Sequence, residues 1–170
     1  MLKVVVLTLL AIVIGFAAIV RLRPLSPDIY HVNLRDMSRV DGIDPGLGGH
    51  FSTLSLPARV DDIAMDISNT VEATPRTTLL AGSLVESENS LIERATFVTR
   101  SAVWGFPDVT TIEIETTNMG AFVRIYGRLV YGQSDFGVNK ARIDGWIDQL
   151  YALPIRDHFG NPIKQRPEIS

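Results

Sequence analysis

The 170-residue chain contains no cysteine. Disulfide bonds, thiol catalysis and cysteine-ligated metal sites are therefore excluded. It also lacks any run of basic residues, and its 16 Lys and Arg are balanced by 19 Asp and Glu. Because nucleic-acid binding depends on a concentrated basic surface, we expect no nucleic-acid partner.

Histidine is scarce as well, with His31, His50 and His158 scattered over segments expected to be loops. None of them has a neighbour at the spacing typical of a zinc site. The sequence has no G-x-S-x-G nucleophile motif, no Walker A loop and no dinucleotide-binding fingerprint. We therefore predict neither a metal site nor a cofactor.

The N-terminal segment is strongly apolar. Val4–Val20 (VVVLTLLAIVIGFAAIV) has 17 residues and no charge, and with its flanking residues it covers about 30 Å as a helix, enough to cross a bilayer. A cleaved signal peptide is the alternative, but the apolar run exceeds the usual 7–15 residues or so, and no clear cleavage site follows it. We predict a single-pass anchor over residues 1–23, with residues 4–20 in the lipid bilayer.

The side of the membrane on which the rest of the chain lies is open. Arg21, Arg23, Arg35 and Arg39 follow the apolar segment and only Lys3 precedes it, so the positive-inside rule favours the cytoplasm. A two-residue N-terminal tail with one lysine is also typical of a signal anchor, which would export the domain. We expect a bacterial inner membrane in either case.

Proline and glycine divide the remainder. Ser26 and Pro27 can begin a short helix that runs through Met37, and Asp41–Gly49 (DGIDPGLGG) is rich in turn residues. Pro162 and Pro167 favour a C-terminal tail that is extended or disordered. The predicted divisions are an anchor at 1–23, a linker with a short helix at 24–55, a domain at 56–154 and a tail at 155–170.

Hydrophobic periodicity predicts a helix, four strands and a helix. Such an order favours an α+β fold, a four-stranded antiparallel sheet with helices on its apolar face, preceded by the transmembrane helix. A tight turn at Asn118–Gly120 would place Glu113 opposite Arg124 and Ile112 opposite Ile125. The predicted elements are helix Arg59–Glu72, strands Thr77–Glu86, Leu91–Ser101, Thr110–Thr117 and Ala121–Val130, with a turn at Glu86–Ser90, and helix Asn139–Leu153, in which Gly145 indicates close packing.

The junction between the last strand and the last helix, Gly132–Arg142 (GQSDFGVNKAR), is dense in glycine and polar residues. Gly132 and Gly137 are expected to adopt positive φ, and Asn139 is the expected N-cap. Asp135 has two interpretations: a local turn or cap, or a general base or cation-binding carboxylate. We favour the local role.

Four motifs follow one another in the second half of the chain: Arg100-Ser101, Gly105–Asp108 (GFPD), Arg128, and Gly132–Asn139 (GQSDFGVN) with Arg142. Together they resemble the DUF1499 family over roughly residues 59–153. The sequence departs from the family pattern at Val109 and at Tyr126–Val130. The resemblance implies a largely bacterial family of unassigned biochemical role, many of whose members look membrane-attached.

The arginines of the predicted sheet also have two interpretations. Arg100, Arg124 and Arg128 can form cross-strand ion pairs on a solvated face, for example Arg124 with Glu113. Alternatively, they form a patch that receives a carboxylate or a phosphate headgroup.

The candidate ligand-binding or signature residues are Arg100, Ser101, Asp108, Arg128, Gly132, Ser134, Asp135, Gly137, Asn139 and Arg142. We expect a membrane-anchored binding or structural module at the cell envelope, with a small anionic or amphiphilic ligand or a protein partner. The alternative is an enzyme that uses Asp135, Asn139 and an arginine in acid–base or phosphoryl chemistry.

Overall fold

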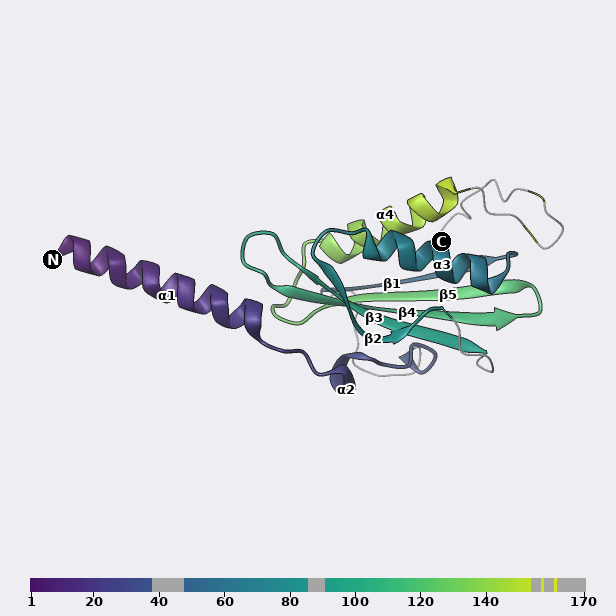
Figure 1. Cartoon of the computed structure of the whole chain (residues 1–170), viewed down its shortest axis with the longest axis horizontal. Coiled ribbons are helices and arrows are strands. Elements are labelled where there is room, and N and C mark those ends of the chain that lie inside the picture. The colour runs from purple at the N-terminus through teal and green to yellow at the C-terminus, as the bar shows by residue number, and fades with distance from the viewer. Residues whose placement is uncertain (38–47, 86–90, 154–156, 158–160, 162–170) are drawn as a thin grey trace.

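The computed structural model describes residues 1–37, 48–85, 91–153, 157 and 161. An N-terminal helix extends away from an α+β body (Figure 1). The elements are α1 (Leu2–Leu22), α2 (Pro27–Tyr30), β1 (Gly49–Leu56), α3 (Val60–Glu72), β2 (Thr77–Ser83), β3 (Ile92–Arg100), β4 (Pro107–Thr117), β5 (Gly120–Leu129) and α4 (Val138–Ala152).

The sheet is antiparallel and has five strands in the order β1-β5-β4-β3-β2. The predicted count of four was wrong because Gly49–Leu56 forms an additional edge strand beside β5. Leu54 and Leu56 are buried while Thr53 and Ser55 are exposed, a short alternation that follows a glycine-rich stretch. Its partner strand begins more than 60 residues later, at Gly120, so no local turn signal marks the pairing.

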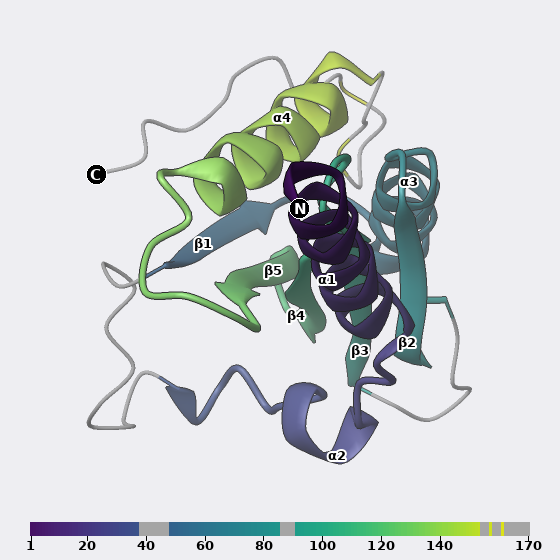
Figure 2. The same ribbon diagram turned by 90° about the vertical axis from the view of Figure 1, so that its left-hand side faces the viewer.

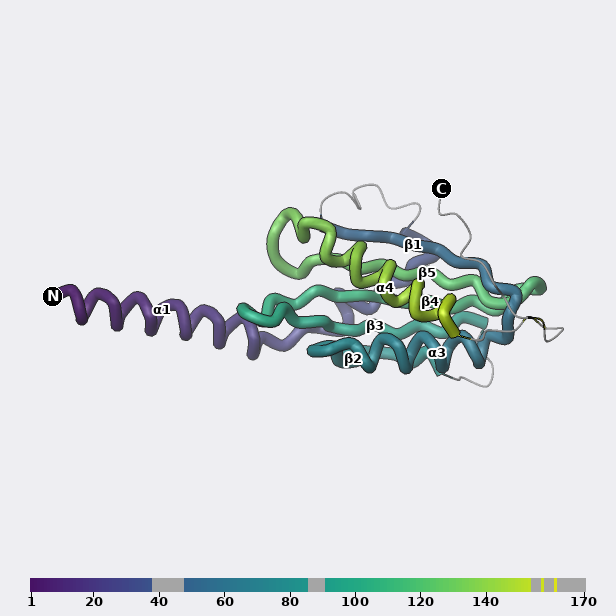
Figure 3. The backbone as a smooth tube through the Cα atoms, turned by 90° about the horizontal axis from the view of Figure 1, so that it is seen from above, coloured from purple at the N-terminus to yellow at the C-terminus, as the bar shows by residue number. Residues whose placement is uncertain are grey.

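The hairpin of β4 and β5 has the predicted register, with Ile112 opposite Ile125 and Glu113 opposite Arg124. Because side chains alternate along a strand, this register places the isoleucines on one face and the charged residues on the other. Helices α3 and α4 lie side by side over the apolar face (Figure 3), as the two-layer prediction requires.

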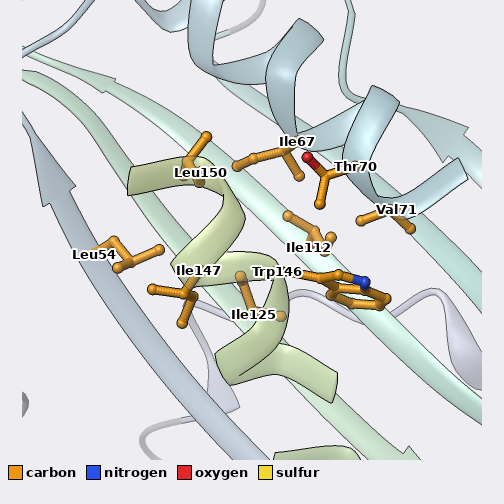
Figure 4. A pocket seen from close by; sticks show the side chains of 9 residues that line it. All are labelled: Leu54, Ile67, Thr70, Val71, Ile112, Ile125, Trp146, Ile147 and Leu150. Atoms are coloured by element: carbon orange, nitrogen blue, oxygen red, sulfur yellow. The ribbon is translucent and has the colours of Figure 1, made fainter. Parts of the chain in front are cut away.

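The core between the two helices and the sheet is closely filled. Ile63 and Val71 of α3, Ile112 of β4 and Ile143 of α4 are all fully buried. The gap that remains, lined by Leu54, Ile67, Thr70, Val71, Ile112, Ile125, Trp146, Ile147 and Leu150, has a volume of about 10 Å³ (Figure 4). That is about the volume of one water probe, so this part of the core has no room for a ligand.

The opposite face of the sheet is covered by residues 24–37, here called the strap (Figure 2). The predicted helix through Met37 was wrong, because the helix ends at Tyr30. Beyond it the backbone binds the sheet instead of itself: the Tyr30 carbonyl accepts a hydrogen bond from Thr111 Oγ1 at 3.2 Å, and Leu34 N–H donates to Glu113 Oε1 at 2.9 Å. Leu34 is 1% exposed.

The charged residues beneath the strap pair differently from the prediction. Glu113 is fully buried and accepts from Arg94 Nε at 2.5 Å, whereas Arg124 pairs with Glu115 at 2.9 Å. In the sheet register Glu113 lies between Arg94 on β3 and Arg124 on β5. It therefore has two possible cross-strand cations, and the pairing with Arg94 also leaves its Oε1 in reach of Leu34.

Three predicted segments fall wholly or largely outside the described residues: the turn-rich linker Asp41–Gly49 except its last two residues, the turn Glu86–Ser90, and the tail after Pro154 except Asp157 and Asn161.

Helix α1 is long and apolar enough to cross a membrane. Apart from Val20, its side chains are largely exposed. A membrane span and a signal sequence both fit this description. The fold therefore establishes an apolar N-terminal helix and does not distinguish between the two.

Glu113→Ala is expected to lower the free energy of unfolding by about 3 kcal/mol, and the Tm of the full chain in mild detergent by roughly 5–10 °C. The substitution leaves Arg94 without its carboxylate and the buried Leu34 N–H without an acceptor. Glu115→Ala, on the same face but partly exposed, is the control and should cost much less. Equal losses in thermal unfolding would contradict a special role for Glu113.

Candidate functional site

The ten candidate residues do not converge on one site. Most of them lie at the start of α4, Arg128 lies under the strap on the other face of the sheet, and Arg100 and Ser101 lie where α1 meets the domain. The three places are described in turn.

The start of α4 is organised by the Asp135 carboxylate. Asp135 Oδ1 accepts from Gly137 N–H at 3.0 Å and Oδ2 from Asn139 N–H at 2.7 Å. Burial raises the pKa of Asp135, but the hydrogen bonds from Asn139 and Gly137 outweigh it and the net shift is downward. Asp135 therefore has the local capping role favoured from the sequence.

The prediction that Asn139 is the N-cap was wrong. The cap position belongs to Gly137, whose φ of +82° is left-handed, a conformation that glycine adopts without strain. Asn139 lies inside the first turn of α4 and is fully buried. The helix begins earlier than predicted: Asp135 accepts the N–H groups of Gly137 and Asn139, and Ala141 N–H already donates to Gly137 O at 2.9 Å.

Asn139 belongs to a buried polar cluster with Arg142 and Asp108. Its Nδ2 donates to Gly48 O at 3.4 Å, and its Oδ1 accepts from Arg142. Arg142 also pairs with Asp108 at 3.3 Å, where the two side chains are 10% and 13% exposed. Burial raises the pKa of Asp108, with Arg142 opposing the shift, and burial lowers the pKa of Arg142, with Asp108 opposing it. The cluster fixes α4 to β4 and to the chain before β1.

This cluster has few groups available for chemistry. Both Asp135 oxygens and the Asn139 amide are engaged with protein groups. Within the cluster, Arg142 Nε is buried without a hydrogen-bond partner among the described residues, and so is Thr110 Oγ1, which lies two residues after Asp108 on β4. The Asp108 carboxylate is a proton acceptor within the cluster, and its Oδ2 is held in the ion pair with Arg142.

An open groove of about 310 Å³ lies beside the cluster, between the C-terminal end of α3 and α4. Arg142, Gly145 and Trp146 contribute to its lining. The close packing predicted at Gly145 was wrong: a Cβ built there meets no atom within 4 Å. Glycine widens the groove at this point and does not admit a neighbouring element.

Arg128 lies under the strap. Its guanidinium donates to the Tyr30 carbonyl and to Thr111 Oγ1, and it lies 5.2 Å from the centroid of the Tyr126 ring. Burial lowers the pKa of Arg128, with Tyr126 and Tyr30 opposing the shift. Arg128 therefore holds the strap and is separated from Asp135 and Asn139 by the sheet.

Arg100 lies at the end of β3 and contacts the C-terminal end of α1. Arg100 Nη1 donates to Val20 O and to Gly105 O, both at 3.1 Å, and Nη2 lies 3.5 Å from Arg23 O. Carbonyls in the last turn of a helix have no partner within the helix and carry partial negative charge. The guanidinium of Arg100 satisfies one of them and complements this charge.

The connection from β3 to β4 completes this contact, here called the α1 joint. Arg21 Nη2 donates to Val103 O at 2.8 Å and to Ala102 O at 3.2 Å. Gly105 has a φ of +73°, and a Cβ there would lie 2.3 Å from Arg21 Cγ. Glycine is therefore required both by the backbone conformation and by the approach of α1.

Aromatic residues pack around the same joint. Phe106 lies edge-on to Phe16 of α1 at 6.3 Å and to Tyr131 at 6.2 Å between ring centroids. Arg23 lies over the Tyr131 ring at 5.9 Å. Ser101 closes the loop, since its Oγ accepts from Phe106 N–H at 3.0 Å. Arg100, Ser101 and the GFPD motif thus act together at the end of α1.

A pocket of about 310 Å³ opens at the α1 joint and is lined by Arg21, Arg76, Thr78, Arg100, Ser101 and Gly105. Nothing in the sequence pattern distinguishes Arg76, and by sequence Arg21 is only a charge that flanks the apolar segment. These residues come from α1, from the residue before β2 and the start of that strand, from the end of β3 and from the β3–β4 loop, so no spacing in the sequence connects them. Arg76 has a positive φ of +61°, but this backbone conformation cannot be predicted from an arginine in the sequence.

Within the described ranges, no three His, Cys, Asp or Glu side chains are grouped so that they could hold a metal ion. His50 contacts Ser52 at 3.0 Å, and His31 contacts Thr96 at 2.9 Å.

Comparison with known proteins identifies a family but no function. No match was found among the curated proteins. A solved structure of a DUF4468 family protein from Bacteroides ovatus aligns with 75% of this chain and 92% of its own, at 12% identity and a TM-score of 0.30, too low to support any argument. The model of the DUF1499 family, described as a protein of unknown function, matches residues 50–150. That match covers more than half of the sequence and confirms the resemblance, so the chain belongs to the DUF1499 family.

Proposed function

We propose that this protein is a membrane-anchored module of the cell envelope whose α1 is retained in the mature chain. Helix α1 would hold the α+β domain at a fixed position against the bilayer, where the domain binds a small anionic or amphiphilic ligand or a protein partner. We propose a binding role for the domain and not a catalytic one. The observation that carries the proposal is the bond from Arg100 to Val20 O at 3.1 Å.

The α1 joint supports retention of the helix. A signal peptide is removed, so the mature domain gains nothing from contacts with its last turn. Here Val20 is only 6% exposed, Gly105 is shaped to admit Arg21, and Arg100 takes its acceptors from α1 and from the β3–β4 loop. Removing α1 would leave the Arg100 guanidinium without these helix carbonyls.

The enzyme alternative has less support. It requires Asp135, Asn139 and an arginine to be available to a substrate. Both carboxylate oxygens of Asp135 accept hydrogen bonds from backbone N–H groups, and Asn139 is fully buried. Arg100 and Arg128 lie at separate places and bind backbone carbonyls.

The mature protein is expected to keep α1 and to behave as an integral membrane protein. Its intact mass should correspond to a chain that includes α1, and alkaline carbonate should not release it from membranes. A mature chain that begins after Val20 would refute the proposal.

Arg100→Gln is expected to loosen the α1 joint and to speed trypsin cleavage after Arg21 by roughly tenfold, the equivalent of losing charge-assisted hydrogen bonds. Limited proteolysis of the full chain in detergent measures this rate. Arg124→Gln is the matched control, because Arg124 lies on the same sheet face but pairs with Glu115. Equal acceleration in both variants would indicate general destabilisation and argue against the joint.

Asp135→Asn is expected to lower the Tm by about 2–4 °C at neutral pH, the cost of losing part of a helix cap. Because the folded pKa of Asp135 is lowered, its stabilisation is complete above the ordinary aspartate pKa. The difference in Tm should therefore shrink as the pH falls through the folded value.

Ser134→Ala is the neighbouring control for Asp135→Asn. The bond that Ser134 Oγ accepts from Phe136 N–H is long, at 3.3 Å, so its loss should change the Tm less. The enzyme alternative would be favoured if Asp135→Asn left the Tm unchanged and yet abolished a cellular phenotype that depends on the protein.

A further inference from the structure

We propose that the arginine-lined pocket at the α1 joint binds the phosphate of an anionic phospholipid from the leaflet in which α1 ends. This inference rests on the proposed function, because it requires α1 to be retained in the membrane. It adds the chemical class of the ligand and the residues that hold it.

The pocket has the size and donors for a phosphate group. Its volume is about 310 Å³, and three of its six lining residues are arginines. Thr78 and Ser101 add hydroxyl groups to the lining. Guanidinium groups bind phosphate through paired N–H donors, and hydroxyl groups can add further hydrogen bonds.

Arg76 is the residue best placed to receive such a ligand. Its Nε donates to Arg100 O at 3.0 Å, which fixes the side chain at the pocket. Arg76 is exposed, and its two Nη groups have no partner in the part of the chain that the structure describes. A guanidinium that is held by Nε and free at both Nη groups can offer a two-pronged contact to a phosphate.

The positive charge of the pocket is not compensated. Elsewhere in the chain, a carboxylate oxygen lies within 4.0 Å of Arg35, Arg59, Arg94, Arg124 and Arg142. Arg23 and Arg128 have none among the residues that the structure describes, but neither lines the pocket and each lies against an aromatic ring. In the described ranges, the arginines that line the pocket have none, and their recorded bonds go to backbone carbonyls. Three guanidinium groups lining one pocket repel one another, and an anion between them removes that cost.

The position of the pocket favours a lipid over a soluble anion. Arg21 belongs to the last turn of α1, so the pocket lies where an apolar helix would leave the bilayer. The β3–β4 loop beside it, which lies next to the C-terminal end of α1 (Figure 3), exposes Val103 by 73% and Trp104 by 44%. Tryptophan is enriched at the membrane–water interface, and basic groups at this depth attract anionic headgroups.

The test is a titration of the full chain in detergent micelles with short-chain phosphatidylglycerol, short-chain phosphatidylcholine and inorganic phosphate. Binding is followed by native mass spectrometry and by the rise in Tm. Phosphatidylglycerol should bind more tightly than either alternative. Arg76→Gln should weaken its binding by about tenfold or more, the loss of charge-assisted hydrogen bonds.

Arg59→Gln is the matched control. It removes the same charge from an exposed arginine just before α3 and should leave phosphatidylglycerol binding unchanged. Equal binding to Arg76→Gln and to the parent chain overturns the inference, as does equal binding of phosphatidylcholine. Inorganic phosphate that binds as tightly as phosphatidylglycerol would assign the pocket to a soluble anion. If the mature chain keeps α1 but binds no lipid selectively, the inference fails while the proposed function stands.

Discussion

The bond from the Arg100 guanidinium to the last turn of α1 is the interaction on which the arrangement of this protein depends. Arg21, through its bonds to Val103 O and Ala102 O, and Phe16, through its contact with Phe106, support the same attachment. Through Arg100, the end of β3 satisfies a carbonyl of Val20 that the helix itself cannot satisfy. The same guanidinium also donates to Gly105 O, so the β3–β4 loop, the strand and the helix are fixed together.

The strap provides a second attachment between the N-terminal region and the sheet. It begins directly after α1, and its backbone is held by Glu113, Thr111 and Arg128. Glu113 is fully buried and depends on Arg94 for compensation, because a buried carboxylate without a cation is strongly destabilising. The sheet therefore has a hydrophobic face under α3 and α4 and a polar face that binds backbone, and each face has a separate role.

The family signature is explained by these attachments. Asp108, Asp135, Asn139 and Arg142 fix α4 through hydrogen bonds and an ion pair. Arg100, Ser101 and Gly105 build the α1 joint. Arg100, Ser101 and Gly105 also line the arginine-lined pocket, where they meet Arg21 of α1 and Arg76 and Thr78 near the start of β2.

The sequence by itself determined the apolar helix, the α+β class, the β4–β5 register and the family, because each depends on local periodicity or on a contiguous motif. Only the tertiary structure decided the fifth strand, the shift of the cap from Asn139 to Gly137, the pairing of Glu113 with Arg94 and the pocket of Arg21, Arg76 and Arg100. In each of these cases the group that decides the outcome is distant in the chain, as β5 is for β1, or is one of several side chains of similar chemistry, as Arg94 and Arg124 are for Glu113. Periodicity carries no information about which distant groups will meet, since that depends on how the elements pack.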